Sequence, residues 1–112
     1  MNPETVVQRR LDAYNARDLG AFLAMYSENI RVFRPPIVEP VMAGKAAFGD
    51  FYATQRFNKE DLHAELVNRM VVGNRVIDHL RISGVRGQSF EVAVVYEVVN
   101  DLIQYTWFYA AD

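Results

Sequence analysis

The sequence predicts an α+β fold in which N-terminal helices pack on one face of a curved, mostly antiparallel sheet. Apolar residues recur at helical spacing early in the chain, whereas β-branched and aromatic residues dominate from residue 62 onward. Two dipeptides that favour tight hairpin turns, Gly73-Asn74 and Asn100-Asp101, divide this second part into four consecutive strands. Helices followed by successive antiparallel strands are typical of α+β domains. A sheet that curls around helices leaves a pocket at its open end.

Two short helices are expected at the N-terminus. Asn2 precedes Pro3, which is the order of an N-cap residue and a proline at the first helical position. Asp18 is placed to cap a second helix. The apolar residues of the two helices are Val7, Leu11, Tyr14, Leu19, Phe22, Leu23, Met25 and Tyr26. The two helices should meet in an antiparallel corner.

One strand and a third helix are expected before the hairpins. Residues 30–34 alternate as a strand until Pro35-Pro36 interrupts it. A loop over residues 37–43 leads to a helix over residues 45–57. The side chains that share one face of this helix are Phe48, Phe51, Tyr52 and Gln55.

The first hairpin pairs residues 62–72 with residues 75–83. Counting outward from its two-residue turn pairs Arg69 with Asp78, Asn68 with His79, Val67 with Leu80 and Glu65 with Ile82. Neighbouring residues of a strand point to opposite faces of the sheet. Asp78 and His79 therefore cannot line the same pocket.

The second hairpin pairs residues 90–99 with residues 102–110. A two-residue loop pairs Glu97 with Gln104, Val95 with Thr106 and Ala93 with Phe108. This face is mixed in polarity, and we expect it to line the pocket. The opposite face would carry Tyr96, Tyr105, Trp107 and Tyr109. These are too many large rings to leave in water, so we expect this face to form a homodimer interface.

Length and composition predict one domain over residues 1–112, located in the cytoplasm. The chain is 51% hydrophobic and 23% charged, which is ordinary for a globular domain. Its first residues lack a signal-peptide pattern, and no run reaches the roughly 18 apolar residues of a membrane span. A formal net charge of −2 provides no basic field for nucleic acid or anionic membranes. With no cysteine and two histidines, neither a metal site nor a cofactor is expected.

Several strings in the chain resemble those of the nuclear transport factor 2-like superfamily, and within it the SnoaL-like and ketosteroid-isomerase-like proteins. In the N-terminal half these strings are Val6-Val7-Gln8-Arg9, Asn15-Ala16-Arg17-Asp18-Leu19 and Gly44-Lys45-Ala46-Ala47. The last hairpin of many SnoaL-like domains is similar to Tyr96-Glu97-Val98-Val99-Asn100-Asp101-Leu102-Ile103 followed by Trp107-Phe108-Tyr109. The resemblance spans nearly the whole chain. It implies a cone-shaped α+β barrel.

The working residues of the isomerase are mostly replaced in this chain. Its phenolic proton donor falls on Arg10, and its general-base aspartate falls on Arg34. The second acid of its oxyanion hole falls near Val95 or Tyr96, and a supporting tyrosine matches at Tyr52. Because arginine stays protonated, Arg34 cannot abstract a proton. The resemblance therefore implies the fold of the isomerase without its proton shuttle.

Two carboxylates are candidate catalytic residues. Glu97 could act as a general base if its face of the sheet encloses the pocket, or it is a rim glutamate bonded to Gln104. Asp78 opposite Arg69 forms either an ion pair that orients a ligand at the pocket mouth or an exposed cross-strand pair. His79 is either a proton shuttle or a structural histidine held by hydrogen bonds.

The expected function is binding of a small, partly apolar organic molecule. Candidate ligand contacts are Arg10, Tyr14, Arg34, Tyr52, Arg69, Thr106 and Phe108. Arg10 and Arg34 would suit an anionic group such as a carboxylate if both face the pocket, or else they extend to solvent.

Two classes of function remain open from the sequence. The first is cofactor-independent acid-base chemistry, such as isomerisation, dehydration or cyclisation, with Glu97 or Asp78 as the base. The second is a noncatalytic ligand-binding or dimerisation module. A titratable carboxylate inside the pocket would favour the first class, and a pocket lined by aromatic residues and arginine would favour the second.

Overall fold

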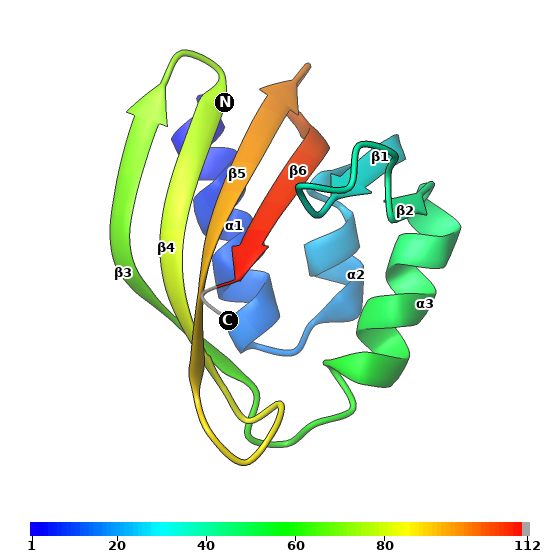
Figure 1. Cartoon of the computed structure of the whole chain (residues 1–112). Helices are drawn as coiled ribbons and strands as arrows, with labels where there is room; N and C mark the ends of the chain where they lie inside the picture. Colours follow the sequence, from blue (N-terminus) through cyan, green and yellow to red (C-terminus); the bar gives the residue numbers. More distant parts are fainter. Residues whose placement is uncertain (111–112) are drawn as a thin grey trace.

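The computed structural model describes residues 1–110 and places a layer of helices against one curved sheet (Figure 1). The elements are α1 (Pro3–Asn15), α2 (Leu19–Leu23), β1 (Tyr26–Phe33), β2 (Met42–Ala43), α3 (Lys45–Gln55), β3 (His63–Val72), β4 (Arg75–Ser83), β5 (Phe90–Val99) and β6 (Leu102–Ala110). The strand order is β2-β1-β6-β5-β4-β3. Within residues 1–110, only the β1–β6 pairing is parallel. The predicted α+β class and cone-shaped barrel are confirmed.

The signals that start the first two helices act as predicted. The side chain of Asn2 accepts a hydrogen bond from the backbone N–H of Thr5 at 2.8 Å, and Asp18 accepts one from Ala21 at 3.1 Å. Strand β1, however, begins at Tyr26, which was expected to belong to the second helix. Tyr26 pairs with Ile103 of β6, so tertiary pairing overrides the local helical spacing.

A bulge in β6 shifts the register of the last hairpin. Glu97 pairs with Tyr105, so the predicted pairing with Gln104 is wrong. Gln104 is the extra residue of a β-bulge, and its side-chain amide donates to the backbone oxygen of Asn29 at 2.8 Å. The pairs beyond the bulge are Tyr96–Thr106, Val95–Trp107, Val94–Phe108 and Ala93–Tyr109.

This bulge decides which side chains of the hairpin face the helices. The buried inner face combines Val92, Val94, Tyr96 and Val98 with Ile103, Thr106 and Phe108. Tyr96 is fully buried, so its predicted place on an outer aromatic face is wrong. Tyr105, Trp107 and Tyr109 do lie on the outer face, because the extra residue turns β6 relative to β5.

The first hairpin contains a second bulge, at Val67. The predicted pairs Arg69–Asp78 and Asn68–His79 are confirmed. Beyond them Leu80 pairs with Leu66 rather than Val67, and Ile82 pairs with Ala64 rather than Glu65. The slip keeps Leu66 on the inner face with Leu80, where both contact the core.

Candidate functional site

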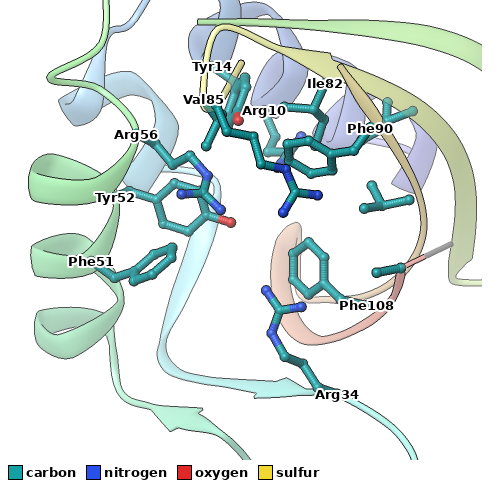
Figure 2. Close-up of a pocket in the computed structure, with 14 residues that line it drawn as sticks. Arg10, Tyr14, Arg34, Phe51, Tyr52, Arg56, Ile82, Val85, Phe90 and Phe108 are labelled. Atoms are coloured by element: carbon teal, nitrogen blue, oxygen red, sulfur yellow. The ribbon is translucent and has the colours of Figure 1, made fainter. Parts of the chain in front are cut away.

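A cavity of about 320 Å³ lies between the helices and the inner face of the sheet (Figure 2). It borders the loop that joins β4 to β5, through Val85 and Arg86. Of the predicted ligand contacts, those that line it are Arg10, Tyr14, Arg34, Tyr52 and Phe108. Figure 2 shows the hydroxyl of Tyr52 directed into this space.

Arg10 is the most deeply buried charged residue of the cavity wall among residues 1–110. It lies on the apolar stripe of α1 with Val6, Val7 and Tyr14, and its side chain is only 3% exposed. Its Nε donates a hydrogen bond to the Tyr26 hydroxyl at 3.0 Å. Within residues 1–110, no group accepts a hydrogen bond from its Nη1.

Aromatic rings surround the guanidinium of Arg10. Its Cζ lies 5.1 Å from the ring centre of Tyr14, 5.3 Å from that of Phe22 and 5.2 Å from that of Tyr96. Such cation–π contacts offset part of the cost of removing the cation from water. A ring contact does not accept a hydrogen bond from the N–H groups in the plane of the guanidinium, so these groups need other acceptors. None of the described residues places a carboxylate against Arg10.

The tyrosines beside Arg10 are hydrogen-bond donors at every working pH. Burial raises the pKa of Tyr14 to about 12, and burial likewise raises the pKa of Tyr26 and that of Tyr96. The hydroxyls of Tyr96 and of its cross-strand neighbour Thr106 have no partner among residues 1–110. Thr106 is buried next to this cluster but does not line the cavity.

Three further arginines line the cavity nearer its mouth. The guanidinium of Arg34 stacks over Phe108 at 5.2 Å, that of Arg56 over Phe51 at 5.2 Å, and that of Arg86 over Phe90 at 4.1 Å. No aspartate, glutamate or histidine from residues 1–110 lines the same space. The cavity therefore combines cationic groups with aromatic and aliphatic walls.

Asp78 is a buried structural carboxylate outside the cavity. Its side chain is 1% exposed and accepts two hydrogen bonds from Arg69, from Nε at 2.7 Å and from Nη2 at 2.9 Å. Arg69 also donates to Gln8 of α1 at 2.8 Å. The pair thus ties the first hairpin to α1. It is neither the exposed pair nor the ligand-orienting pair that the sequence left open.

Glu97 and His79 both lie on the outer face of the sheet. Glu97 pairs with Arg75 at 3.0 Å, so its predicted place beside Thr106 and Phe108 is wrong. His79 is hydrogen-bonded to Glu91, and this bond lowers the pKa of the Glu91 carboxyl. The structural interpretation of His79 therefore fits its surroundings better than a proton shuttle.

Sequence reasoning missed nine residues of the cavity wall: Phe51, Arg56, Leu80, Ile82, Val85, Arg86, Phe90, Val92 and Ala110. Phe51 shares the helical face of Tyr52, and Arg56 follows four residues after Tyr52, which was an available signal. Arg86 lies in a loop, where no periodicity indicates which way a side chain points.

Neither a cluster of metal-ligating side chains nor a membrane-spanning helix is found among residues 1–110. No three histidine, aspartate or glutamate side chains gather there in a group that could hold an ion. None of its helices is long and apolar enough to cross a membrane.

Comparison with known proteins identifies the architecture. Residues 7–106 match the model of the SnoaL-like domain. A candidate ketosteroid isomerase from Kribbella flavida superimposes with a TM-score of 0.83 at 18% identity, covering 98% of this chain and 78% of the other. An uncharacterised cystatin-fold protein from Novosphingobium aromaticivorans gives 0.86 at 20% identity, covering 97% and 98%.

A third similar structure is a candidate polyketide cyclase from Sinorhizobium meliloti. Its TM-score is 0.78 at 15% identity, and the match covers 94% of each chain. At this level of identity the likeness shows the fold alone. No protein with a curated description matches the sequence significantly.

Replacing Arg10 by methionine should stabilise the protein. The variant keeps a side chain of similar length and removes a buried cation that has no carboxylate partner. We expect the free energy of unfolding to rise by about 1 kcal/mol, although Tyr26 loses its hydrogen-bond donor. Urea denaturation measures this. Arg9→Met, on the exposed side of α1, is the control and should change stability by less than about 0.5 kcal/mol. A large loss of stability in Arg10→Met would contradict the view that Arg10 is a buried cation that the fold does not need.

Breaking the Asp78–Arg69 pair should have the opposite effect. Arg69→Met leaves the Asp78 carboxylate buried without its partner, and we expect a loss of about 3 kcal/mol or more. Arg75→Met, which breaks the more exposed pair with Glu97, should cost no more than about 1 kcal/mol. Equal losses in the two variants would show that the buried pair has no special structural role.

Proposed function

The chain belongs to the SnoaL-like domain family, and we propose that its cavity binds a small, partly apolar organic anion. The single observation that carries this proposal is Arg10, a buried cation in the cavity wall whose Nη1 has no acceptor among residues 1–110. A carboxylate bound in the cavity beside Arg10 would supply the missing negative charge, because no aspartate or glutamate among residues 1–110 lines this space. The aromatic and aliphatic walls would accommodate the rest of the ligand.

A noncatalytic binding role fits these walls better than acid-base catalysis. General-base catalysis needs an unprotonated acceptor within hydrogen-bond reach of the substrate. Asp78 is engaged by Arg69, Glu97 lies on the outer face, and Arg34 takes the place that the resemblance gives to the aspartate base. The described wall residues therefore offer donors and cations but no carboxylate or imidazole base.

An enzymatic role remains the second candidate because the cavity wall holds hydrogen-bond donors. The Tyr52 hydroxyl and the Arg10 guanidinium, which both line the cavity, would stabilise an oxyanion that forms on a bound substrate. Such a site would require the substrate or a solvent molecule to accept the proton. Similar structures named as candidate isomerase and cyclase proteins make these reaction classes the ones to assay.

Binding of a simple carboxylate tests the proposal. We expect octanoate to bind at about pH 7.5, where its carboxyl group is ionised, and Arg10→Met to weaken this binding about tenfold or more. Isothermal titration calorimetry gives both affinities.

Two controls make the result specific to Arg10. Arg9→Met removes the same charge from the exposed side of α1 and should bind octanoate like the native protein. Octanol, which has the same chain without the charge, should bind more weakly than octanoate. Equal binding of octanoate to the native protein and to Arg10→Met would refute the proposal.

We also propose that the outer face of the sheet joins two copies of the chain. An apolar row crosses this face from β1 to β3 and consists of Phe33, Trp107, Val95, Ile77 and Met70. Ion pairs flank this row, including Arg75–Glu97 and Arg81–Glu65, so its border carries charges of both signs. A surface with an apolar centre and mixed charges at its rim suits a two-fold contact with itself.

Sedimentation velocity tests this homodimer. The native chain should sediment as a dimer at micromolar concentration, and Trp107→Glu should sediment as a monomer because it places a charge in the centre of the apolar row. Val38→Glu is the control, since Val38 is 82% exposed in the segment between β1 and β2. A native protein that sediments as a monomer would contradict the dimer.

A further inference from the structure

Tyr26 holds the guanidinium of Arg10 from a position outside the cavity. Its hydroxyl accepts a hydrogen bond from Arg10 Nε at 3.0 Å, and its side chain is fully buried. Among residues 1–110, this is the one hydrogen bond that the guanidinium makes. Arg10 lines the cavity, whereas Tyr26 does not. Tyr26 can therefore act on a bound molecule only through Arg10.

We propose that Tyr26 is the positioning residue of the anion site: its hydroxyl fixes the rotation of the Arg10 guanidinium, so that the free N–H donors meet the ligand carboxylate in one geometry. This inference rests on the proposed function, because it keeps Arg10 as the anchor of an anion. It adds a residue on which the affinity for that anion depends, although this residue does not touch the ligand.

The aromatic contacts of Arg10 cannot fix this rotation by themselves. The rings of Tyr14, Phe22 and Tyr96 lie 5.1 Å, 5.3 Å and 5.2 Å from its Cζ. A ring face attracts the cation as a whole. A hydrogen bond, in contrast, weakens steeply when its angle falls below about 120°. The bond from Nε is therefore the contact that selects one orientation of the group.

Tyr26 is itself held firmly enough to serve as a fixed acceptor. Its backbone is part of β1 and pairs with Ile103 of β6. The centre of its ring lies 5.0 Å from that of Phe22 and 4.5 Å from that of Phe48, and both of these rings are buried. A side chain packed in this way has little freedom to move, so the position of its hydroxyl is defined by the core.

The hydroxyl of Tyr26 orients Arg10 without neutralising it. Burial raises the pKa of Tyr26, so the phenol stays protonated and uncharged at working pH. Asp78, in contrast, both orients Arg69 through two hydrogen bonds and cancels its charge. Because a neutral acceptor leaves the charge of Arg10 intact, the guanidinium can still attract an anion.

A Tyr26→Phe variant tests the inference, because it removes the acceptor and keeps the ring. We expect octanoate to bind this variant about fivefold more weakly than the native protein at about pH 7.5, by isothermal titration calorimetry. Octanol, which carries no charge, should bind equally to both proteins. A loss that is confined to octanoate separates the orientation of Arg10 from a general change of the cavity.

Tyr96→Phe is the matched control. Tyr96 is also fully buried and its ring also faces Arg10, but its hydroxyl has no partner among residues 1–110. This variant should bind octanoate like the native protein. The double variant Arg10→Met/Tyr26→Phe should bind octanoate as weakly as Arg10→Met alone, since Tyr26 acts through Arg10.

Nuclear magnetic resonance reports on the hydrogen bond directly. The Nε–H signal of Arg10 is identified by its loss in Arg10→Met. We expect the exchange of this proton with water to be at least about tenfold faster in Tyr26→Phe than in the native protein, and unchanged in Tyr96→Phe. An Nε–H of Arg10 that exchanges in the native protein as fast as those of exposed arginines would overturn the inference even if Tyr26→Phe did not fold.

The outcomes separate this inference from the proposed function. If octanoate binds through Arg10 and Tyr26→Phe binds it as tightly as the native protein, Tyr26 is not a positioning residue and the proposed anion site stands. Equal losses in Tyr26→Phe and Tyr96→Phe, or a further loss in the double variant, would also overturn the inference. If octanoate binds equally to the native protein and to Arg10→Met, both proposals fail.

Discussion

The burial of Arg10 among aromatic rings is the constraint on which the site depends. An arginine cannot shed its charge at working pH, so the core must accommodate a permanent cation. Tyr26 accepts one of its hydrogen bonds, and the rings of Tyr14, Phe22 and Tyr96 face the guanidinium. These contacts explain how the cation is tolerated. They do not explain why a position on the apolar stripe of α1 holds a cation at all.

The buried carboxylate Asp78, also on the inner face, shows how a charge with a purely structural role is satisfied in this fold. Arg69 meets Asp78 through two hydrogen bonds and reaches Gln8 with its remaining nitrogen. This pair is neutral as a unit and satisfied, and neither residue lines the cavity. Arg10 has no such carboxylate and does line the wall. The contrast between the two arginines supports a ligand as the missing partner, since binding sites are commonly retained at some cost to stability.

Much of the fold could be predicted because its signals are local. The caps at Asn2 and Asp18 and the turns at Gly73-Asn74 and Asn100-Asp101 each depend on a few neighbouring residues. The bulges could not be predicted, since each depends on contacts with a neighbouring strand. Gln104, for example, bonds to Asn29 of β1, which lies far away in the sequence.

A single bulge residue also explains the main error about the site. Without the bulge, the alternation of side chains along the two strands places Glu97 on the same face as Thr106 and Phe108. That face, which is mixed in polarity, was therefore expected to line the pocket. With the bulge, Glu97 turns outward to Arg75, and the β5 residues assigned to the partner face turn inward. Arg10, Arg34 and Tyr52 line the cavity. Their assignment rests on the alignment of whole elements in the resemblance, which such a slip does not affect.

The most direct test of this account is a crystal structure of the protein with octanoate bound. The account predicts the carboxylate of the ligand within hydrogen-bond distance of the Arg10 guanidinium and the alkyl chain along the apolar wall of the cavity. A structure in which the ligand leaves Arg10 without a carboxylate, or occupies a place outside the cavity, would contradict it.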